Sequence, residues 1–280
     1  MQKTCKLFIV SVFVGAALCA PAKGDSLLID AATGVTWGDF TVEDVTADVE
    51  TTYFNPAVSL EYSFGEDKNF TFAVGVGYSQ SGNDFVGEWD GSEGKHSKGE
   101  VTVDRNIFDL YGRFWASPNF NLRFGYRYFK YEFSDGLLEK TQYGTLIEKA
   151  ENAEATGDLR KGLDLEANFI GGKDIYVRLG LGYSYFIDAE YDWEYERTKY
   201  PGDQKDRNEG SATHTAHGVR IVPEVAVKLA DNLRLCLDYR LAASIWEGTT
   251  DQADIEDCPG VDIYSAFGVG IEYLFPLGKR

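Results

Sequence analysis

The C-terminal stretch 261–275 alternates between apolar residues and small or polar ones. Its odd positions, from Val261 to Phe275, are mostly apolar, whereas its even positions, from Asp262 to Glu272, are mostly small or charged. Side chains of a β-strand point alternately to its two faces, so this pattern predicts a strand with one apolar face and one polar face. The same alternation recurs along nearly the whole chain and predicts about ten strands: 27–40, 54–64, 70–79, 108–115, 120–128, 159–170, 175–193, 219–229, 233–246 and 261–275.

Short and long connections alternate strictly between these predicted strands. Short ones follow Phe64, Trp115, Ile170 and Leu229, and long polar segments such as 80–100, 134–157 and 196–210 are predicted as loops. The pattern predicts an all-β fold, an antiparallel up-and-down transmembrane β-barrel with short periplasmic turns, long extracellular loops and both termini periplasmic. In the stretch that begins at 120 the alternation breaks near Phe129, where we expect the strand to leave the membrane.

A secreted soluble barrel, apolar inside and charged outside, is the alternative interpretation. The charges do not discriminate, because the sequence alone does not say which face is inside. The glycines favour the membrane interpretation, because they lie on the polar face, where they would leave room for long arginine side chains in a crowded interior. They are Gly75, Gly77, Gly125, Gly180, Gly182, Gly268 and Gly270.

The first 22 residues have the organisation of a secretory signal peptide. Lys3 and Lys6 precede an apolar run over 7–18, and the small residues Ala20 and Ala22 indicate cleavage after Ala22. Lipidation at Cys19 is an alternative, with Leu18 in the place where that signal has a small residue. The remainder, 23–280, contains no Pro- or Ser-rich linker and is predicted to form one domain.

The net charge and the cysteines narrow the choice of partners and cross-links. The formal charge is −18, which argues against a nucleic-acid partner. Cys236 and Cys258 remain after cleavage, in a compartment that allows disulfides. The predicted strands place them about 30 Å apart along the barrel, so both are expected to be unpaired, with Cys236 facing inward.

The polar faces of the predicted strands carry charges of both signs in near-equal numbers. Buried charges persist when they are paired, so we expect a network that fills much of the lumen and leaves a narrow or closed pore. An ion-selectivity role for these charges is the alternative. The basic members are Arg113, Arg123, Arg127, Arg160, Arg178, Arg220, Lys228, Arg234 and Arg240, and the acidic members are Glu61, Asp109, Asp164, Glu166, Glu224, Asp238, Asp262 and Glu272.

The alternating pattern and the terminal aromatic strand resemble those of bacterial outer-membrane β-barrel proteins of the OmpA-, OmpW- and Opa-like superfamily. Tyr273 and Phe275 occupy the place of the terminal aromatic signal, although residues 276–280 follow it here. The resemblance implies outer-membrane lipid, lipopolysaccharide and the barrel-assembly machinery as partners. It leaves any extracellular ligand unknown.

The strand number and projecting strand ends also resemble the omptin family of outer-membrane proteases. Glu88 matches one position of the acidic pair of those enzymes, and Asp192 matches their aspartate, but Glu194 stands where their histidine should be. A carboxylate does not replace an imidazole as a base near neutral pH without a large pKa shift. His214 on the neighbouring strand is the one candidate that would restore the pair, and a rim histidine without a catalytic role is the alternative.

No other catalytic pattern is present, and no cofactor or metal is predicted. The acidic segments 84–93 and 251–257 are interpreted as solvated, with Ca²⁺ binding as the alternative. The sequence therefore predicts an integral outer-membrane barrel with a structural or surface-interaction role. The alternatives are a narrow small-solute porin and an omptin-like surface protease without its usual chemistry.

Overall fold

The computed structural model describes residues 25–42, 45–52, 54–64, 71–90, 92–249 and 260–277. The predicted signal peptide and Cys258 lie outside these residues. The described strands form one antiparallel sheet. A short 3₁₀ turn, η1 (Ser92–Gly94), joins two of them. The strands are β1 (Ser26–Val42), β2 (Val45–Thr52), β3 (Phe54–Phe64), β4 (Thr71–Asp90), β5 (Lys95–Ser117), β6 (Phe120–Gln142), β7 (Thr145–Gly172), β8 (Ile175–Lys199), β9 (Gln204–Ala230), β10 (Leu233–Thr249) and β11 (Gly260–Pro276).

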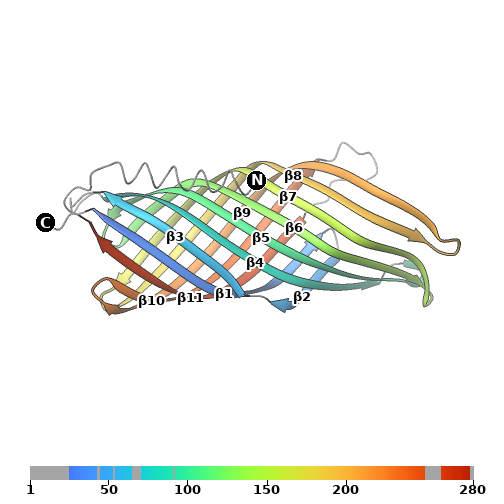
Figure 1. Cartoon of the computed structure of the whole chain (residues 1–280), viewed down its shortest axis with the longest axis horizontal. Helices are drawn as coiled ribbons and strands as arrows, with labels where there is room; N and C mark the ends of the chain where they lie inside the picture. The colour runs from blue at the N-terminus through green and yellow to red at the C-terminus, as the bar shows by residue number, and fades with distance from the viewer. Residues whose placement is uncertain are drawn as a thin grey trace.

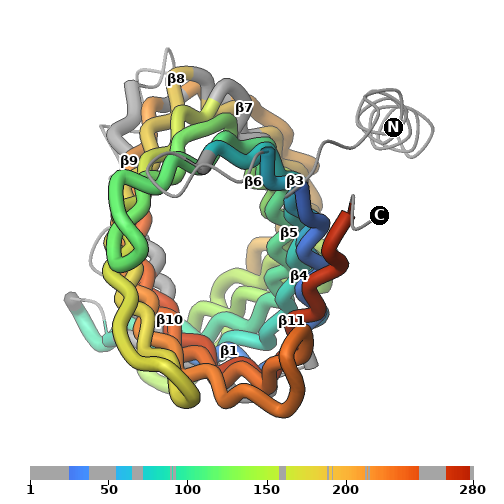
Figure 2. The backbone as a smooth tube through the Cα atoms, turned by 90° about the vertical axis from the view of Figure 1, so that its left-hand side faces the viewer, coloured from blue at the N-terminus to red at the C-terminus, as the bar shows by residue number. Residues whose placement is uncertain are grey.

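The sheet closes on itself by pairing of its first and last strands. β1 pairs with β11 over its whole length, from Ser26 opposite Pro276 to Val42 opposite Gly260. β2 and β3 both pair with β1 and β4, at different heights, so together they fill one position of the ring. The described strands therefore make a ring of ten positions, as predicted (Figure 2). The fold is an antiparallel transmembrane β-barrel.

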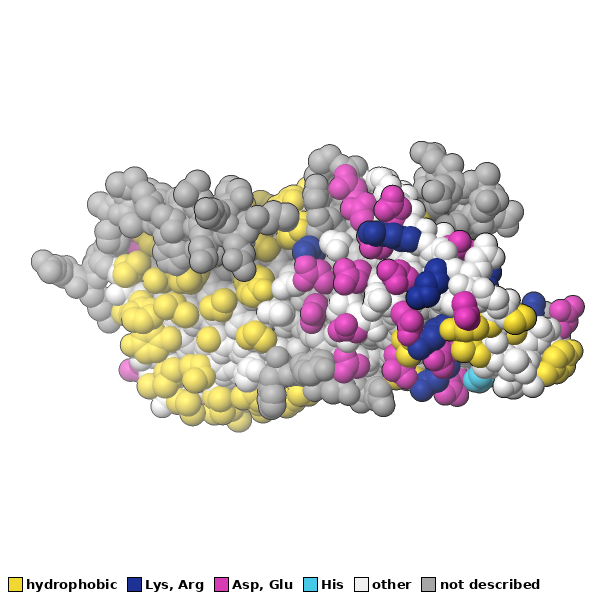
Figure 3. All heavy atoms as spheres, turned by 45° about the vertical axis from the view of Figure 1, so that its right-hand side comes forward, with side chains coloured by type: hydrophobic (Ala, Val, Ile, Leu, Met, Phe, Trp, Pro, Cys, Tyr) yellow, Lys and Arg dark blue, Asp and Glu magenta, His cyan; other side chains and the backbone are white. Residues whose placement is uncertain are grey.

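One half of the barrel carries an apolar belt on its outer surface. Alternate side chains of its strands are exposed and apolar, such as Leu163, which is 62% exposed. Figure 3 shows these side chains gathered at one end of the molecule. The apolar belt comprises Val58, Phe64, Phe72, Phe124, Leu163, Leu165, Phe169, Ile175, Val177, Leu179, Leu181, Val219, Ile221, Val225, Val227, Leu229, Leu237, Leu241, Ile263, Phe267, Val269 and Ile271.

The segments predicted as long loops are continuations of the strands. β4 and β5 pair up to Asp90 opposite His96, β6 and β7 up to Gln142 opposite Thr145, and β8 and β9 up to Lys199 opposite Gln204. The prediction of loops at 80–100, 134–157 and 196–210 was therefore wrong. Their polarity was taken as a sign of irregular structure, but long polar strands can still pair their backbone hydrogen-bonding groups in hairpins. These paired strands form the hairpin extension, on the right in Figure 1.

The side-chain pattern inverts where the strands pass from the belt into the hairpin extension. On β6 the buried side chain is polar in the belt, at Asn121, and aromatic in the extension, at Phe129 and Tyr131. On the opposite face of the extension, Lys130 and Glu132 form an ion pair. The change in pattern lies near Phe129, where the strand was expected to leave the membrane, and β6 continues beyond it to Gln142. The wall instead continues with an apolar interior and a charged exterior, the arrangement expected of a barrel surrounded by water.

The interior of the hairpin extension holds a hydrophobic cluster contributed by five strands. Its buried members come from β4, β5, β6, β8 and β9: Phe85, Val103, Ile107, Phe129, Tyr131, Phe186, Ala189 and Ala216. At the other end of the barrel the described turns, between β5 and β6, β7 and β8, and β9 and β10, are two residues long, so the short turns predicted there are confirmed. The start of β1, Ser26, and the end of β11, Pro276, both lie at this short-turn end. No helix among the described residues is long and apolar enough to cross a membrane.

Candidate functional site

Inside the apolar belt, arginines and carboxylates form a paired network. Its centre is Asp109 on β5, which accepts hydrogen bonds from Arg123 at 2.8 Å and from Arg127 at 2.7 Å, both on β6. Arg127 also lies 3.5 Å from Asp164 on β7. Because these side chains are mostly buried, each charge depends on its partners for the solvation that it lost on burial.

Arg220 on β9 extends this network across an intervening strand. It donates to Asp164 at 2.7 Å and to Glu166 at 2.8 Å, and both acceptors lie on β7. β8 separates the two strands, and the guanidinium passes over Gly182 of β8. A methyl carbon at Gly182 would lie 2.6 Å from Arg220 Nε, so the glycine leaves the space that the crossing requires. Ser184, also on β8, accepts a further hydrogen bond from Arg220 at 3.2 Å.

Three more pairs line the remaining wall of the interior. Arg113 on β5 lies 3.3 Å from Glu61 on β3, again across a strand, β4. Arg178 on β8 pairs with Glu224 on β9, and Arg234 on β10 lies 3.3 Å from Glu272 on β11. The structure thus brings together most of the charged residues that the sequence placed on the polar faces.

Some members of that predicted set are placed differently. Lys228 is exposed and pairs with Asp231 in the β9–β10 turn at 2.8 Å, so it does not belong to the interior. Asp238 and Arg240 line a common interior cavity, but neither forms an ion pair within the part of the chain that the structure describes. The side chains of Arg160 and Asp262 lie outside the described residues.

Arg105 is a buried interior cation that the sequence interpretation missed. Its side chain is 1% exposed and lies on β5, above the network, where its guanidinium donates to Asn83 at 3.0 Å. The guanidinium carbon lies 5.4 Å from the ring centre of Phe85, 5.9 Å from that of Tyr131 and 5.6 Å from that of Tyr264. The alternation of β5 could have revealed it, because Arg105 lies two residues before Ile107 and four before Asp109 and so points to the same, inward side.

The contact between Arg105 and Tyr264 spans the barrel. Arg105 lies on β5 and Tyr264 on β11, which are separated by β1, β3 and β4 in a ring of ten positions. Cation–aromatic contacts are favourable, the more so where water is excluded. The pair therefore forms a crossbar over the interior, held on one side by the apolar cluster of the extension and on the other by the charged network.

Among the described residues, three cavities between side chains lie along the interior. One, of about 280 Å³, reaches the short-turn end near Pro118 and Asn232. A second, of about 140 Å³, lies among the charges at Asp109 and Arg127, and a third, of about 120 Å³, lies beside Asp238. Neighbouring cavities share lining residues, with Arg178 common to all three. The space is thus divided by side chains into compartments.

Two of the omptin-like candidates, Glu88 and Asp192, lie on strands that are not adjacent in the ring. Glu88 on β4 and Asp192 on β8 are both exposed, and β5, β6 and β7 separate their strands along the shorter path around the ring. The backbone of His214 pairs with Ala189, but its side chain lies outside the described residues. Asp192 lines a shallow surface pocket with Glu194 and Glu209.

Tyr273 and Phe275, the predicted assembly signal, lie on β11 at the short-turn end. Their ring centres are 4.2 Å apart, and Phe275 is 40% exposed. Asn232 in the β9–β10 turn donates a 2.6 Å hydrogen bond to the hydroxyl of Tyr273. The pair is therefore tied to the turn at the same end of the barrel.

Comparison with solved structures identifies the fold. The chain is similar to the outer membrane protease OmpT from Escherichia coli, with 11% identity and a TM-score of 0.52 over 89% of this chain and 97% of that one. The translocator domain of the autotransporter NalP from Neisseria meningitidis matches over 97% and 94% of the two chains, with 14% identity and a TM-score of 0.39. Ail, the attachment invasion locus protein of Yersinia pestis, matches over 90% and 99%, with 10% identity and a TM-score of 0.32.

The likeness to OmpT, which has a TM-score above 0.5, defines the class of fold, an outer-membrane β-barrel, and no particular activity. No protein-family model and no curated protein matches the chain.

Proposed function

We propose that the protein is a non-conducting outer-membrane barrel that presents its hairpin extension at the cell surface as an interaction platform. The crossbar of Arg105 and Tyr264 carries this proposal, because it bridges the interior directly above the charged network. Paired charges below and an apolar cluster around the crossbar favour a filled interior. A filled barrel serves as an anchor, and its external wall is then the part available to partners.

The charge of the hairpin extension favours a basic partner. The hairpin extension, residues 80–107, 129–161 and 186–217, contains 21 acidic and 12 basic side chains, so this end of the molecule attracts cations and repels anions. On β8 the exposed positions Glu190, Asp192, Glu194 and Glu196 follow one another at every second residue. Such a row suits an extended polycationic ligand more than a neutral one.

Planar-bilayer recordings of the refolded protein test whether the interior is closed. Folded, inserted wild-type protein is expected to pass no measurable current, whereas Arg105→Ala, which removes one side of the crossbar, should give stable conductance steps. Tyr264→Phe keeps the aromatic ring and should remain silent. Ion-selective steps from the wild-type protein would refute the closed barrel and favour the second candidate.

That second candidate is a narrow small-solute channel. The contiguous interior cavities support it, because adjacent compartments share lining residues along the barrel. Conduction would require the charged side chains between them to move aside. The bilayer recordings separate the two functions directly.

Labelling of intact cells tests which end faces outward. Tyr143, at the tip of the β6–β7 hairpin, is 79% exposed, and Asn119 is exposed in the β5–β6 turn at the opposite end. A membrane-impermeant maleimide should label Tyr143→Cys on intact cells and should reach Asn119→Cys only after the outer membrane is opened. The reverse order of labelling would contradict the proposed orientation.

A further inference from the structure

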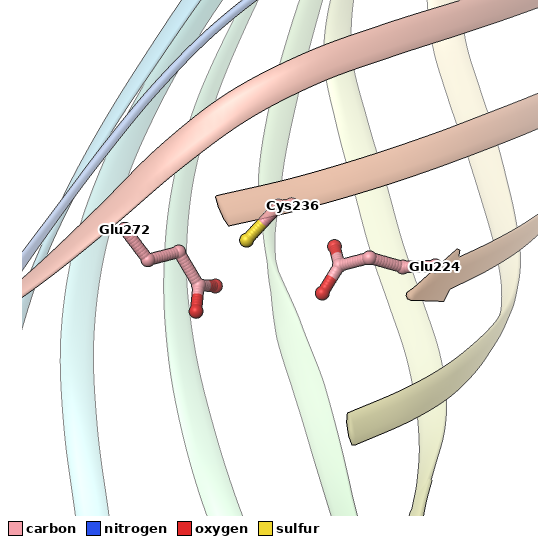
Figure 4. Close-up of side chains that lie close together, drawn as sticks. All are labelled: Glu224, Cys236 and Glu272. Carbon is pink, nitrogen blue, oxygen red and sulfur yellow. The ribbon is translucent and has the colours of Figure 1, made fainter. Parts of the chain in front are cut away.

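Three side chains on adjacent strands point their ligand atoms toward one another inside the barrel. They are Glu224 on β9, Cys236 on β10 and Glu272 on β11, and one ligand atom of each lies within 4.8 Å of the others. Figure 4 shows the sulfur of Cys236 between the two carboxylates. We propose that this triad binds a borderline-soft divalent metal ion of the Zn²⁺ class, with the thiolate and one oxygen from each carboxylate as ligands.

The thiol of Cys236 is the observation that distinguishes the triad from an ordinary acidic cluster. Cys236 is a free cysteine, only 4% exposed, and its sulfur forms no hydrogen bond within the described part of the chain. A thiolate favours Zn²⁺ and similar ions over Ca²⁺ and Mg²⁺, which prefer oxygen ligands. Zinc sites with three protein ligands leave one position for water or substrate.

The arginines beside the triad leave one oxygen free on each carboxylate. Arg178 donates to Oε2 of Glu224, and Arg234 donates to Oε2 of Glu272 at 3.3 Å. Oε1 of each glutamate therefore remains available to a metal, and the arginines act as outer partners that hold the carboxylates in place.

The local charge balance also calls for a cation. Asp30 lies opposite Glu272 across the β1–β11 pair, and Asp238 lies opposite Glu224 across the β9–β10 pair. Like charges directly opposite each other destabilise a sheet. Neither aspartate has an ion pair among the described residues, so Arg178, Arg234 and Arg240 face four carboxylates. When the Cys236 thiolate is included, the negative charges exceed the positive charges by two, and one divalent ion neutralises this excess.

Small neighbours and a cavity give the ion room and access. Across the sheet, Cys236 lies between Ala226 on β9 and Gly270 on β11. The interior cavity of about 280 Å³ is lined by both glutamates of the triad and reaches the short-turn end at Asn232. A metal ion could therefore enter from that end without opening the barrel wall.

Cobalt absorbance gives a direct test in the refolded full chain. With Cys5, Cys19 and Cys258 replaced by Ser, Cys236 is the one thiol. One equivalent of Co²⁺ should then produce thiolate-to-cobalt absorption, and Zn²⁺ should abolish it by displacement. Folded protein that shows no such absorption would overturn the proposal.

Two matched glutamate variants distinguish specific Zn²⁺ binding at the triad from unspecific attraction of Zn²⁺ by the negative charges of the interior. Glu272 and Glu61 are both buried, and each lies 3.3 Å from a single arginine. Zn²⁺ affinity measured by calorimetry should fall at least about tenfold in Glu272→Gln and in Cys236→Ser, and it should stay within about twofold in Glu61→Gln. An equal loss in the Glu61 variant would show that Zn²⁺ binds the interior unspecifically.

A measurement on the parent chain covers the case in which a variant does not fold. Saturating Zn²⁺ should raise the unfolding temperature of the protein by about 5 °C or more, because the unfolded chain lacks the assembled triad. Mg²⁺ at the same concentration should not. An unchanged unfolding temperature with Zn²⁺ contradicts the proposal.

Discussion

Gly182→Ala offers a sharp test of how the interior charges stabilise the barrel. The added methyl carbon would lie 2.6 Å from Arg220 Nε, so the guanidinium has to move. Arg220 donates hydrogen bonds of 2.7 Å and 2.9 Å to Asp164 and of 2.8 Å to Glu166, and displacement would break part of this set. Both carboxylates would then remain in the interior with less compensation.

The expected loss follows from two opposing effects. Breaking a buried ion pair costs about 3–5 kcal/mol, and replacing a strand glycine by alanine returns about 0.5–1 kcal/mol. Gly182→Ala should therefore lower the free energy of unfolding by about 2–4.5 kcal/mol. Urea titration of the protein in detergent or lipid vesicles, followed by tryptophan fluorescence, measures this quantity.

Gly77→Ala is the matched control. It also lies in a strand with its missing side chain directed inward, but a methyl carbon there would be 3.8 Å from the nearest atoms, on Asp109 and Ser59. Its stability should equal that of the wild type or exceed it by about 0.5–1 kcal/mol. Equal stability of the Gly182 variant and the wild type, or an equal loss at both glycines, would refute the packing argument.

Two further predictions concern the outer surface. Leu179→Arg places a cation in the apolar belt and should cost about 2–4 kcal/mol near the bilayer midplane, whereas Thr213→Arg, on the exposed face of the hairpin extension, should leave vesicle-based unfolding nearly unchanged. In the extension, burial raises the pKa of Asp104 above its usual range, with nearby carboxylates adding to the shift. The folded state then holds that proton more tightly than the unfolded state, so the ionised carboxylate costs stability as pH rises. Asp104→Asn should therefore stabilise the protein at about pH 8 and have no effect at about pH 3, and a pH-independent difference would contradict this reasoning.

The two-residue alternation was sufficient to predict the barrel from the sequence. A period of two with one apolar face sets the direction of each side chain, and ten such stretches set the number of ring positions. The positions of Arg123, Asp164 and Glu272 inside the barrel follow from phase alone. Their individual partners do not, because pairs such as Arg220 with Glu166 connect strands that are distant in sequence and not adjacent in the sheet.

The hairpin extension was misinterpreted for a physical reason. Above the belt the strands face water, so their outer face becomes charged and their inner face apolar, and a long polar segment then looks like a loop. Tyr131 and Phe129 continue the inward phase of Arg127, although they belong to the opposite polarity class. Arg105 was missed for the same cause, since it lies on β5 beyond the point where that strand was thought to begin.

The ion pairs that cross over an intervening strand bear on how the barrel is assembled. Arg220 on β9 with Glu166 on β7, and Arg113 on β5 with Glu61 on β3, each require three strands to be in place before the contact exists. Adding one hairpin at a time therefore leaves charges unpaired until the next strand arrives. The Arg105–Tyr264 contact forms only once β11, the last strand, is in place. These contacts between non-adjacent strands therefore stabilise the interior only late in folding. Closure of the barrel is consequently cooperative, and a partly assembled barrel is poorly stabilised.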